Sequence, residues 1–130
     1  MGRSRGIVLG SGRVRRGDVV TVALQGDFGK PQPAVIVQSD LFEDIPTVTL
    51  VAFTSHLQDA ELLRHTVAPS AENGLKLVSQ AMVDKLSTLP REKVGPVVGR
   101  LDPVDMEAIN QRLAVFLGFA DPPSLRSGKS

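Results

Sequence analysis

The amino-acid sequence predicts one α+β domain, mostly β, in which a curled and mostly antiparallel sheet is covered by one C-terminal helix. Three observations predict it. Residues 19–24 form a β-branched run, residues 34–37 form a continuous apolar run typical of a strand buried on both faces, and residues 102–118 carry the signals of a helix start and end. At 130 residues, the chain is long enough to bury one hydrophobic core.

Composition and charge exclude several classes of protein. There are no cysteines, so disulfides and thiolate metal sites are excluded, and we expect a cytoplasmic location. The apolar run 7–9 is too short for a signal-peptide core or a membrane span, so we expect a soluble protein. A net charge of +1 gives little long-range steering, and we interpret the arginines near the N-terminus as a solvated basic arm: Arg3, Arg5, Arg13, Arg15 and Arg16.

The ends of the chain differ from its middle. Residues 1–14 are rich in glycine, serine and arginine without periodicity, which predicts a flexible leader or an artificial tail. Residues 121–130 are polar and proline-rich, which predicts a disordered tail. The predicted domain therefore spans residues 15–120.

The first two strands are predicted at 18–24 and 33–38. Turn-forming residues separate them, namely Gly26, Asp27 and Gly29, and the short spacing favours an antiparallel pair. Pro31 and Pro33 restrict the backbone of the connecting loop, so that Lys30 and Gln32 are held at the edge of the core.

The middle of the chain predicts three further strands. Residues 47–53 are almost wholly apolar and end in Thr54, Ser55 and His56, whereas 62–68 give a weaker strand. Leu75, Leu77, Ala81 and Val83 alternate with Lys76, Gln80 and Asp84, which predicts a half-buried strand over 75–84. A single helical turn at 90–93 and a last short strand at 97–101 follow.

The C-terminal helix has the clearest signals in the sequence. Asp102 is the predicted N-cap, Pro103 and Asp105 lie in the first turn, and Gly118 follows the end. Apolar residues at helical spacing predict one core-facing stripe: Met106, Ile109, Leu113, Phe116 and Leu117.

Several polar residues are candidates for chemistry. His56 and His65 could act as an acid/base pair in phosphodiester cleavage if they meet, although each is also compatible with a structural role. Thr54 and Ser55 after a strand are typical of hydroxyls that satisfy turn amides, and Asp84 with Lys85 is typical of a solvated pair. Metal-ligand spacing and phosphate-binding glycine loops are absent from the sequence.

Ordered blocks of the sequence resemble the MazF/PemK family of toxins over about residues 15–120. The blocks are Arg16-Gly17-Asp18-Val19-Val20, Gly29-Lys30-Pro31-Gln32-Pro33-Ala34-Val35, Thr54-Ser55, Ser79-Gln80-Ala81-Met82-Val83-Asp84-Lys85, Gly99-Arg100-Leu101 and Leu117-Gly118. The resemblance implies an SH3-like barrel of antiparallel strands with a C-terminal helix, of the CcdB/PemK-like type.

The resemblance also implies a function. Members are toxins of type II toxin-antitoxin systems, homodimers that cut single-stranded RNA, including mRNA, at short sequences. They need no metal or cofactor and leave 2′,3′-cyclic phosphate and 5′-hydroxyl ends. A MazE-like antitoxin is the implied protein partner.

One catalytic position departs from the family pattern. The family pairs an arginine with a threonine, and the threonine matches Thr54, but Gln32 stands where the arginine is expected. A neutral amide lacks the charge and the bidentate fork of a guanidinium, so this chain is predicted to be weakened or disabled. The replacement is compatible with a natural or an engineered origin. The predicted RNA-binding residues are Lys30, Ser55, His56, Gln80 and Lys85.

Two alternatives remain open at this stage. A gyrase-binding toxin of the CcdB type shares the barrel, but that resemblance implies a tryptophan near the C-terminus, and the sequence has none. A catalytically silent module that only sequesters an antitoxin is compatible with Gln32.

Overall fold

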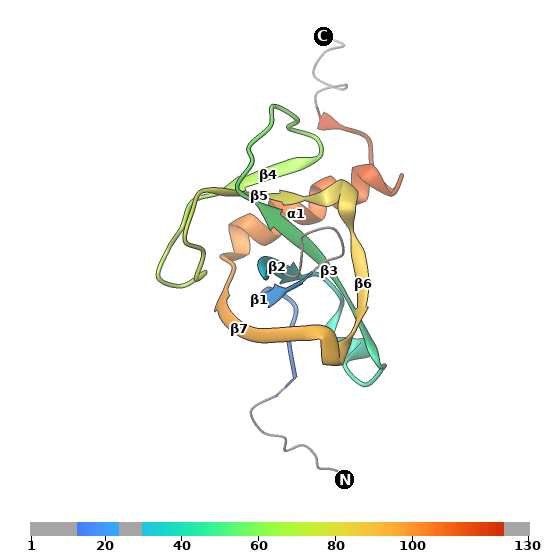
Figure 1. Cartoon of the computed structure of the whole chain (residues 1–130). Helices are drawn as coiled ribbons and strands as arrows, with labels where there is room; N and C mark the ends of the chain where they lie inside the picture. The colour runs from blue at the N-terminus through green and yellow to red at the C-terminus, as the bar shows by residue number, and fades with distance from the viewer. Residues whose placement is uncertain (1–12, 24–29, 124–130) are drawn as a thin grey trace.

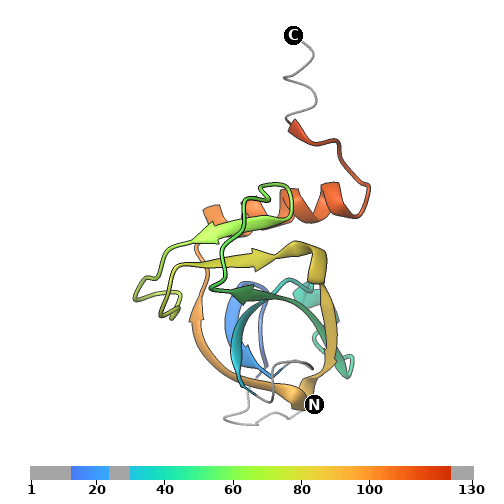
Figure 2. The same ribbon diagram turned by 45° about the horizontal axis from the view of Figure 1, so that its top comes forward.

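The computed structural model describes residues 13–23 and 30–123, and its antiparallel strands curl into an open barrel with one helix across one side (Figures 1 and 2). The strands are β1 (Asp18–Val22), β2 (Gln32–Ile36), β3 (Thr47–Thr54), β4 (Arg64–Val67), β5 (Ser79–Met82), β6 (Ser87–Pro90) and β7 (Val94–Arg100). The helix is α1 (Pro103–Phe116), and the 3₁₀ turns are η2 (Asp40–Phe42), η3 (Val83–Lys85) and η4 (Arg91–Lys93). The predicted fold class is confirmed.

The sheet follows the strand order β4-β5-β3-β2-β1-β7, and β6 pairs with β3. The pairing of β1 with β2 is antiparallel, with Val20 opposite Ala34, as the short connection predicted. Strand β3 is the centre of the fold because it pairs with β2, with β5 and with β6. This topology brings the ends of β2, β3 and β5 side by side.

The two faces of the central strands bury two separate apolar clusters. Val35, Val51 and Phe53 belong to the cluster that packs against Ile109 of α1. Ala34 and Ala52 belong to the second cluster, together with Val20, Val22, Ile36, Val48 and Leu50, on the barrel side of the sheet. Successive residues of a strand point to opposite faces, so the continuous apolar run of β2 is buried on both faces, as predicted.

The region from residue 75 to residue 90 corrects the sequence analysis. Only Ser79–Met82 of the predicted 75–84 strand forms β5, and Leu77 is 61% exposed, whereas Gln80 is 6% exposed. The alternating pattern predicted a strand that is too long, because the residues in the first half of the pattern lie in a loop. Strand β6 was not predicted, because its four residues carry no apolar run and are ordered by pairing with β3.

Helix α1 confirms the predicted caps. The Asp102 carboxylate accepts a hydrogen bond from the Val104 N–H at 2.8 Å, and Gly118 has a left-handed φ of 88° just past the end. The predicted core stripe is only partly correct. Ile109 is buried, with Met106 and Leu113 packed against its cluster, but Phe116 and Leu117 are exposed at the end of the helix.

The domain boundaries of the sequence analysis fall partly outside the described residues. The leader up to residue 12, the turn residues 24–29 and the tail from residue 124 lie there. Arg13 and Val14, which the analysis assigned to the leader, contact the domain: Arg13 pairs with Glu43, and Val14 packs against the barrel-side cluster. Among the described residues, no helix is long and apolar enough to cross a membrane.

Candidate functional site

Three neighbouring strands place polar side chains in one row at their ends. Thr54 of β3 lies opposite Gln80 of β5 in the antiparallel register. On the other side of β3, the pairs with β2 run from Ile36 with Leu50 to Ala34 with Ala52, and Gln32 and Thr54 each lie two residues beyond the last of these pairs. We call Gln32, Thr54 and Gln80 the mouth row. The two residues of the predicted catalytic pair, far apart in the sequence, thus lie at the same end of two neighbouring strands.

Gln32 and Thr54 lie on the barrel side of the sheet, at its edge. They follow the alternation of Ala34 and Ala52, which belong to the barrel-side cluster. Both residues are partly exposed, which leaves them open to a ligand from solvent.

The Thr54 hydroxyl is fixed by a local turn. Its Oγ1 accepts a hydrogen bond from the backbone N–H of His56 at 3.0 Å, which confirms the turn-hydroxyl interpretation of the sequence. A hydroxyl has one O–H donor and two acceptor lone pairs, so this bond leaves the proton free to be donated outward. Ser55 and His56 follow at once and are exposed beside the row.

Gln80 is committed to contacts within the protein. Its Nε2 donates to the Gln58 carbonyl at 3.0 Å and to Thr66 Oγ1 at 3.1 Å, and its Oε1 accepts from the Gln58 N–H at 3.0 Å. The side chain is almost completely buried. The amide predicted to contact RNA therefore holds the loop that follows β3.

The two lysines predicted to bind RNA lie at different distances from the row. Lys30 is exposed and precedes Gln32 by two residues, so it lies at the same edge of the sheet. Lys85 is also exposed, but it lies in η3 just before Ser87, which pairs with Leu50 of β3. A strand rises about 3.3 Å per residue, so Lys85 lies beside the middle of β3, on the order of 10 Å from Thr54 along the strand.

The two histidines do not form the acid/base pair that the sequence left open. His65 lies opposite Ala81, whose other neighbour is Phe53 on the helix side of the sheet. Its Nε2 is 2.9 Å from the Asp105 carboxylate of α1. His65 is therefore engaged on one face, whereas Gln32 and Thr54 lie on the other.

Asp84 is not half of a solvated pair with Lys85. Its carboxylate lies 3.4 Å from Nε of Arg64, and Arg64 is buried in β4. Arg64 and Asp84 are 20 residues apart in the sequence, and β4 and η3 come together only in the folded sheet. The prediction was wrong because it considered only the neighbouring residue as a partner for Asp84. This pair joins the start of η3 to the neighbouring strand and stays away from the mouth row.

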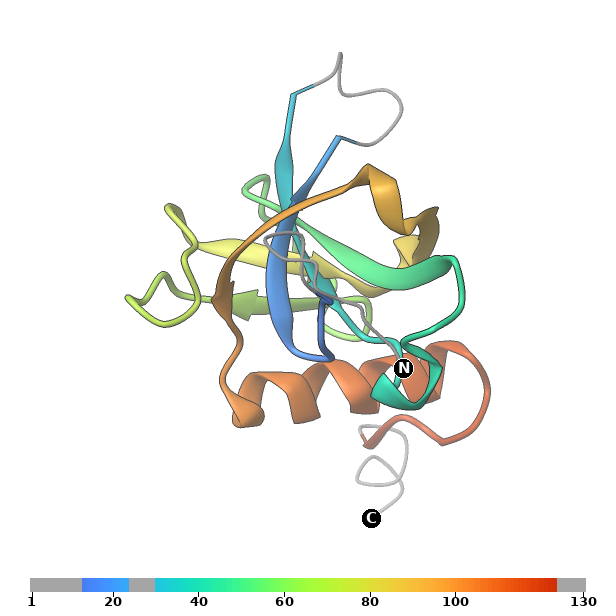
Figure 3. The ribbon, with the colours of Figure 1, turned by 90° about the horizontal axis from the view of Figure 1, so that it is seen from below.

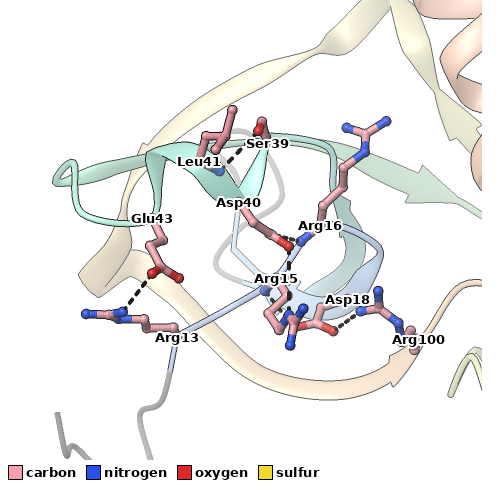
Figure 4. Close-up of polar contacts among 9 residues, drawn as sticks. All are labelled: Arg13, Arg15, Arg16, Asp18, Ser39, Asp40, Leu41, Glu43 and Arg100. Carbon is pink, nitrogen blue, oxygen red and sulfur yellow. Dashed lines mark hydrogen bonds and ion pairs between the residues drawn. The ribbon is translucent and has the colours of Figure 1, made fainter. Parts of the chain in front are cut away.

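Charged residues gather at the opposite end of β2 from Gln32 (Figure 4). Arg15 donates its backbone N–H to Asp18 at 2.8 Å, and Arg100 pairs with the same carboxylate at 2.8 Å. The Arg16 N–H donates to Asp40 at 2.8 Å. We call these residues, together with Arg13 and its partner Glu43, the arm network. The Arg13 and Arg15 side chains are exposed, as the prediction of a solvated arm expected, although each pairs with an acidic residue, whereas Arg16 is partly buried. Arg3 and Arg5 lie outside the described residues.

The Arg16 side chain extends this network to the helix. Its guanidinium donates to the Val37 carbonyl and to Oδ1 of Asn110 on α1. Figure 3 shows the ends of β1 and β2 near α1, with the opposite ends of both strands extending away from it. The arm network therefore fastens the helix end of the hairpin and leaves the mouth row at the other end.

No group of three histidine or acidic side chains that could hold a metal ion occurs in residues 13–23 and 30–123. The sequence analysis missed two contacts: the backbone of Gln58 binds Gln80 of the mouth row, and Arg64 lies 3.4 Å from Asp84, away from the row. The contact of Gln80 with Gln58 uses backbone groups of Gln58, which every residue type except proline has, so the sequence carries no signal for it. A buried arginine within a strand carries some signal, because it requires an anionic partner.

An antiparallel barrel with a C-terminal helix is also the class of fold that comparison with known proteins identifies. A family model described as PemK-like, MazF-like toxin of type II toxin-antitoxin system matches residues 15–117, and the chain belongs to this family. A protein named probable endoribonuclease MazF, from Mycolicibacterium smegmatis, is 44% identical over 108 residues, which cover 82% of this chain and 99% of that protein.

Solved structures support the same fold. An endoribonuclease in complex with its cognate antitoxin, from a mycobacterial species, matches with a TM-score of 0.71 and 24% identity, covering 84% of this chain and 99% of that one. A MazE–MazF structure from Deinococcus radiodurans matches with a TM-score of 0.64 and 15% identity, covering 83% and 98%. The family resemblance of the sequence is confirmed.

Proposed function

We propose that this chain is a metal-independent endoribonuclease that cuts single-stranded RNA, including mRNA, at short sequences. Membership of the MazF-like toxin family supports the proposal. The observation that carries it is that the register of β2 and β3 brings Gln32 and Thr54, both partly exposed, to the same end of the sheet. These two positions correspond to the catalytic pair that the family resemblance implies.

The proposed reaction uses the RNA's own 2′-hydroxyl as the nucleophile. The 2′-hydroxyl gives up its proton as its oxygen forms a bond to the adjacent phosphorus, the bond from phosphorus to the 5′-oxygen breaks, and the 5′-oxygen takes up a proton. The products are a 2′,3′-cyclic phosphate and a 5′-hydroxyl. Thr54 donates its free O–H to a non-bridging phosphate oxygen, and His56, two residues further on, is the candidate for proton transfer.

Gln32 limits the rate of this reaction. Negative charge builds on the phosphate oxygens in the transition state, and a guanidinium at this position would meet it with two charge-assisted hydrogen bonds. The glutamine amide donates neutral hydrogen bonds only. Losing one such donor lowers turnover on the order of a hundredfold to a thousandfold, so we expect slow cleavage by the chain as it stands.

RNA contacts extend from the row to the exposed polar residues around it, namely Lys30, Ser55, His56 and, further along the sheet, Lys85. The sequence has no tryptophan or tyrosine, so recognition relies on hydrogen bonds to unstacked bases and on phosphate contacts. Deoxyribonucleotide substitution at the cut site should block the reaction completely, because it removes the nucleophile.

The working unit is proposed to be a homodimer in the cytoplasm. Large apolar side chains remain exposed at the end of α1 and after it, with Phe116 at 45%, Leu117 at 48% and Phe119 at 80% exposure. A second copy would cover such surface. Sedimentation at micromolar concentration should show a dimer, and a monomer under these conditions would contradict the proposal.

A MazE-like antitoxin is the proposed protein partner. An acidic peptide with apolar anchors would complement exposed apolar surface and the lysines near the row. It should compete with RNA, so a saturating amount of antitoxin should abolish RNA binding. Undiminished RNA binding in the saturated complex would exclude a shared surface.

The deciding experiment incubates the chain and its Gln32→Arg variant with a mixed pool of single-stranded RNA, with and without EDTA. We expect cleavage by the arginine variant, unchanged by the chelator, with cyclic phosphate ends. Robust cleavage by the unaltered chain would move the main catalytic role to another residue, first of all His56. An inert arginine variant that inhibits DNA gyrase would replace the enzyme by a gyrase-binding toxin.

One observation favours a second candidate function. Gln32 at the charged position of the pair is also what a catalytically silent module that binds an antitoxin would carry. In that case the chain binds antitoxin tightly, and neither the chain nor its arginine variant cuts RNA.

A further inference from the structure

The loop between β3 and β4 is fastened to the sheet through a single buried side chain. The Gln80 amide makes two hydrogen bonds to the backbone of Gln58, one as donor to its carbonyl and one as acceptor from its N–H, both at 3.0 Å. The pairing reproduces a pair of sheet hydrogen bonds where the loop has no strand partner. A buried amide that uses both of its ends in this way fixes its partner's position tightly.

The same loop fixes the Thr54 hydroxyl. His56 lies two residues before Gln58, and its backbone N–H donates to Thr54 Oγ1 at 3.0 Å. A threonine side chain rotates about one bond, so this contact sets the direction in which the hydroxyl proton can point. The position of the His56 N–H depends in turn on where the loop is held.

A second side chain holds the far part of the loop. Nε of Arg112 on α1 donates to the Glu61 carbonyl at 2.8 Å. The segment between Thr54 and Glu61 is thus tied to β5 near its start and to α1 near its end. Of these two contacts, the one made by Gln80 belongs to the mouth row, because Gln80 is also the cross-strand neighbour of Thr54.

We infer that Gln80 is a positioning residue that aims the Thr54 hydroxyl at the reacting phosphate, acting through the backbone of Gln58 and His56. This inference rests on the proposed RNA cleavage. It reassigns Gln80 from a residue that touches RNA to one that acts from beneath the site. A misplacement of about 1 Å in a reacting group can lower a rate on the order of a hundredfold, so loosening the loop should be visible in turnover.

The test replaces Gln80 by methionine, which keeps a similar volume and removes all three hydrogen bonds of the side chain, two to Gln58 and one to Thr66. In the Gln32→Arg background, single-turnover cleavage of a defined RNA should fall about tenfold or more with Gln80→Met, with KM changed less than about twofold. Thr66→Val is the matched control. It removes only the 3.1 Å bond from Gln80 to Thr66, keeps both bonds to Gln58, and should leave the rate within about twofold.

A double-mutant cycle separates positioning from a general structural effect. If Gln80 acts through the Thr54 hydroxyl, Gln80→Met should change the residual rate of Thr54→Val less than about twofold. An equal loss with and without the hydroxyl would overturn the inference. If Gln80→Met does not fold, Gln80→Glu, which keeps the acceptor for the Gln58 N–H but loses the donor to the Gln58 carbonyl, should show the same dependence on Thr54.

Amide hydrogen exchange tests the structural part in the chain without any catalytic substitution. Gln80→Met should increase exchange at Gln58 and His56, while the β1–β2 pairing keeps its protection. Unchanged protection at Gln58 would overturn the inference even if RNA cleavage is confirmed. Loss of protection with no RNA cleavage by the Gln32→Arg parent would contradict the proposed function, and the positioning role with it.

Discussion

The two ends of strand β2 use polar residues in opposite ways. At the helix end, the arm network joins Asp18 and Asp40 to arginines through ion pairs and backbone hydrogen bonds. At the other end, the mouth row contains two amides and a hydroxyl, without a formal charge. The charged residues of the arm network pair with one another within the protein. A charged residue placed in the mouth row would instead be available to a ligand.

This difference separates stability from activity along one strand. Charged groups with several protein partners stabilise the fold, and their removal leaves a buried polar group without a partner. A lone cation at an exposed site contributes little to stability but much to the binding of an anionic transition state. Under the proposed mechanism, the residue at position 32 would set the rate of RNA cleavage without any change to the barrel.

The largest expected effect is at the mouth row. Gln32→Arg should raise cleavage of single-stranded RNA on the order of a hundredfold or more, because a guanidinium supplies the missing charge beside Thr54. Single-turnover assays with an end-labelled RNA measure it. Thr54→Val in the same background should remove most of the gain, and Arg13→Gln in the arm network should not change the rate. An equal gain with Arg introduced at Lys30 instead would contradict the role of position 32.

The next effect is at the arm network and concerns stability. Asp18→Ala should lower the free energy of unfolding by about 2 kcal/mol, because the Arg15 N–H loses its acceptor and Arg100 loses its ion pair. Urea denaturation should show a lower midpoint with an unchanged slope. Gln32→Ala, at the other end of β2, should leave the midpoint almost unchanged. A loss of stability with Gln32→Ala as large as with Asp18→Ala would contradict the claim that only the arm-network end of β2 contributes to stability through its polar residues.

A smaller effect is expected for the dependence of RNA binding on salt concentration. Two lysine–phosphate contacts predict roughly a fivefold to tenfold loss of affinity between 50 and 200 mM salt. Fluorescence anisotropy with a short RNA measures the slope, and Lys30→Gln should reduce it by nearly half. Binding that does not respond to salt would show that phosphate contacts do not hold the RNA.

The smallest effect concerns the outermost pair of the arm network. Arg13 lies 3.1 Å from Glu43, but their side chains are 51% and 43% exposed. Solvent screens such a pair, so Glu43→Gln should change the free energy of unfolding by less than about 1 kcal/mol. Urea denaturation beside Asp18→Ala gives the contrast directly. A change as large as that of Asp18→Ala would show that the outer pair is as important to the fold as the inner one.

The elements whose signals are local could be predicted from the sequence alone. The caps of α1, the antiparallel pairing of β1 with β2 and the strand that ends at Thr54 depend on neighbouring residues, and all three are confirmed. The mouth position of Gln32 followed from the prolines around it and from the family resemblance. Alternation was less reliable, because Leu77 fits a strand pattern but lies in an exposed loop.

Which polar residues form hydrogen bonds or ion pairs with one another could not be predicted from the sequence. Gln80 and Gln58, Arg64 and Asp84, and Arg16 and Asn110 are far apart along the chain, and each contact depends on strand order and on the face to which a side chain points. A shift of one residue in register would send each side chain to the opposite face. The residue type limits the kinds of partner that a side chain can bind, and the packing of the sheet determines which partner lies within reach.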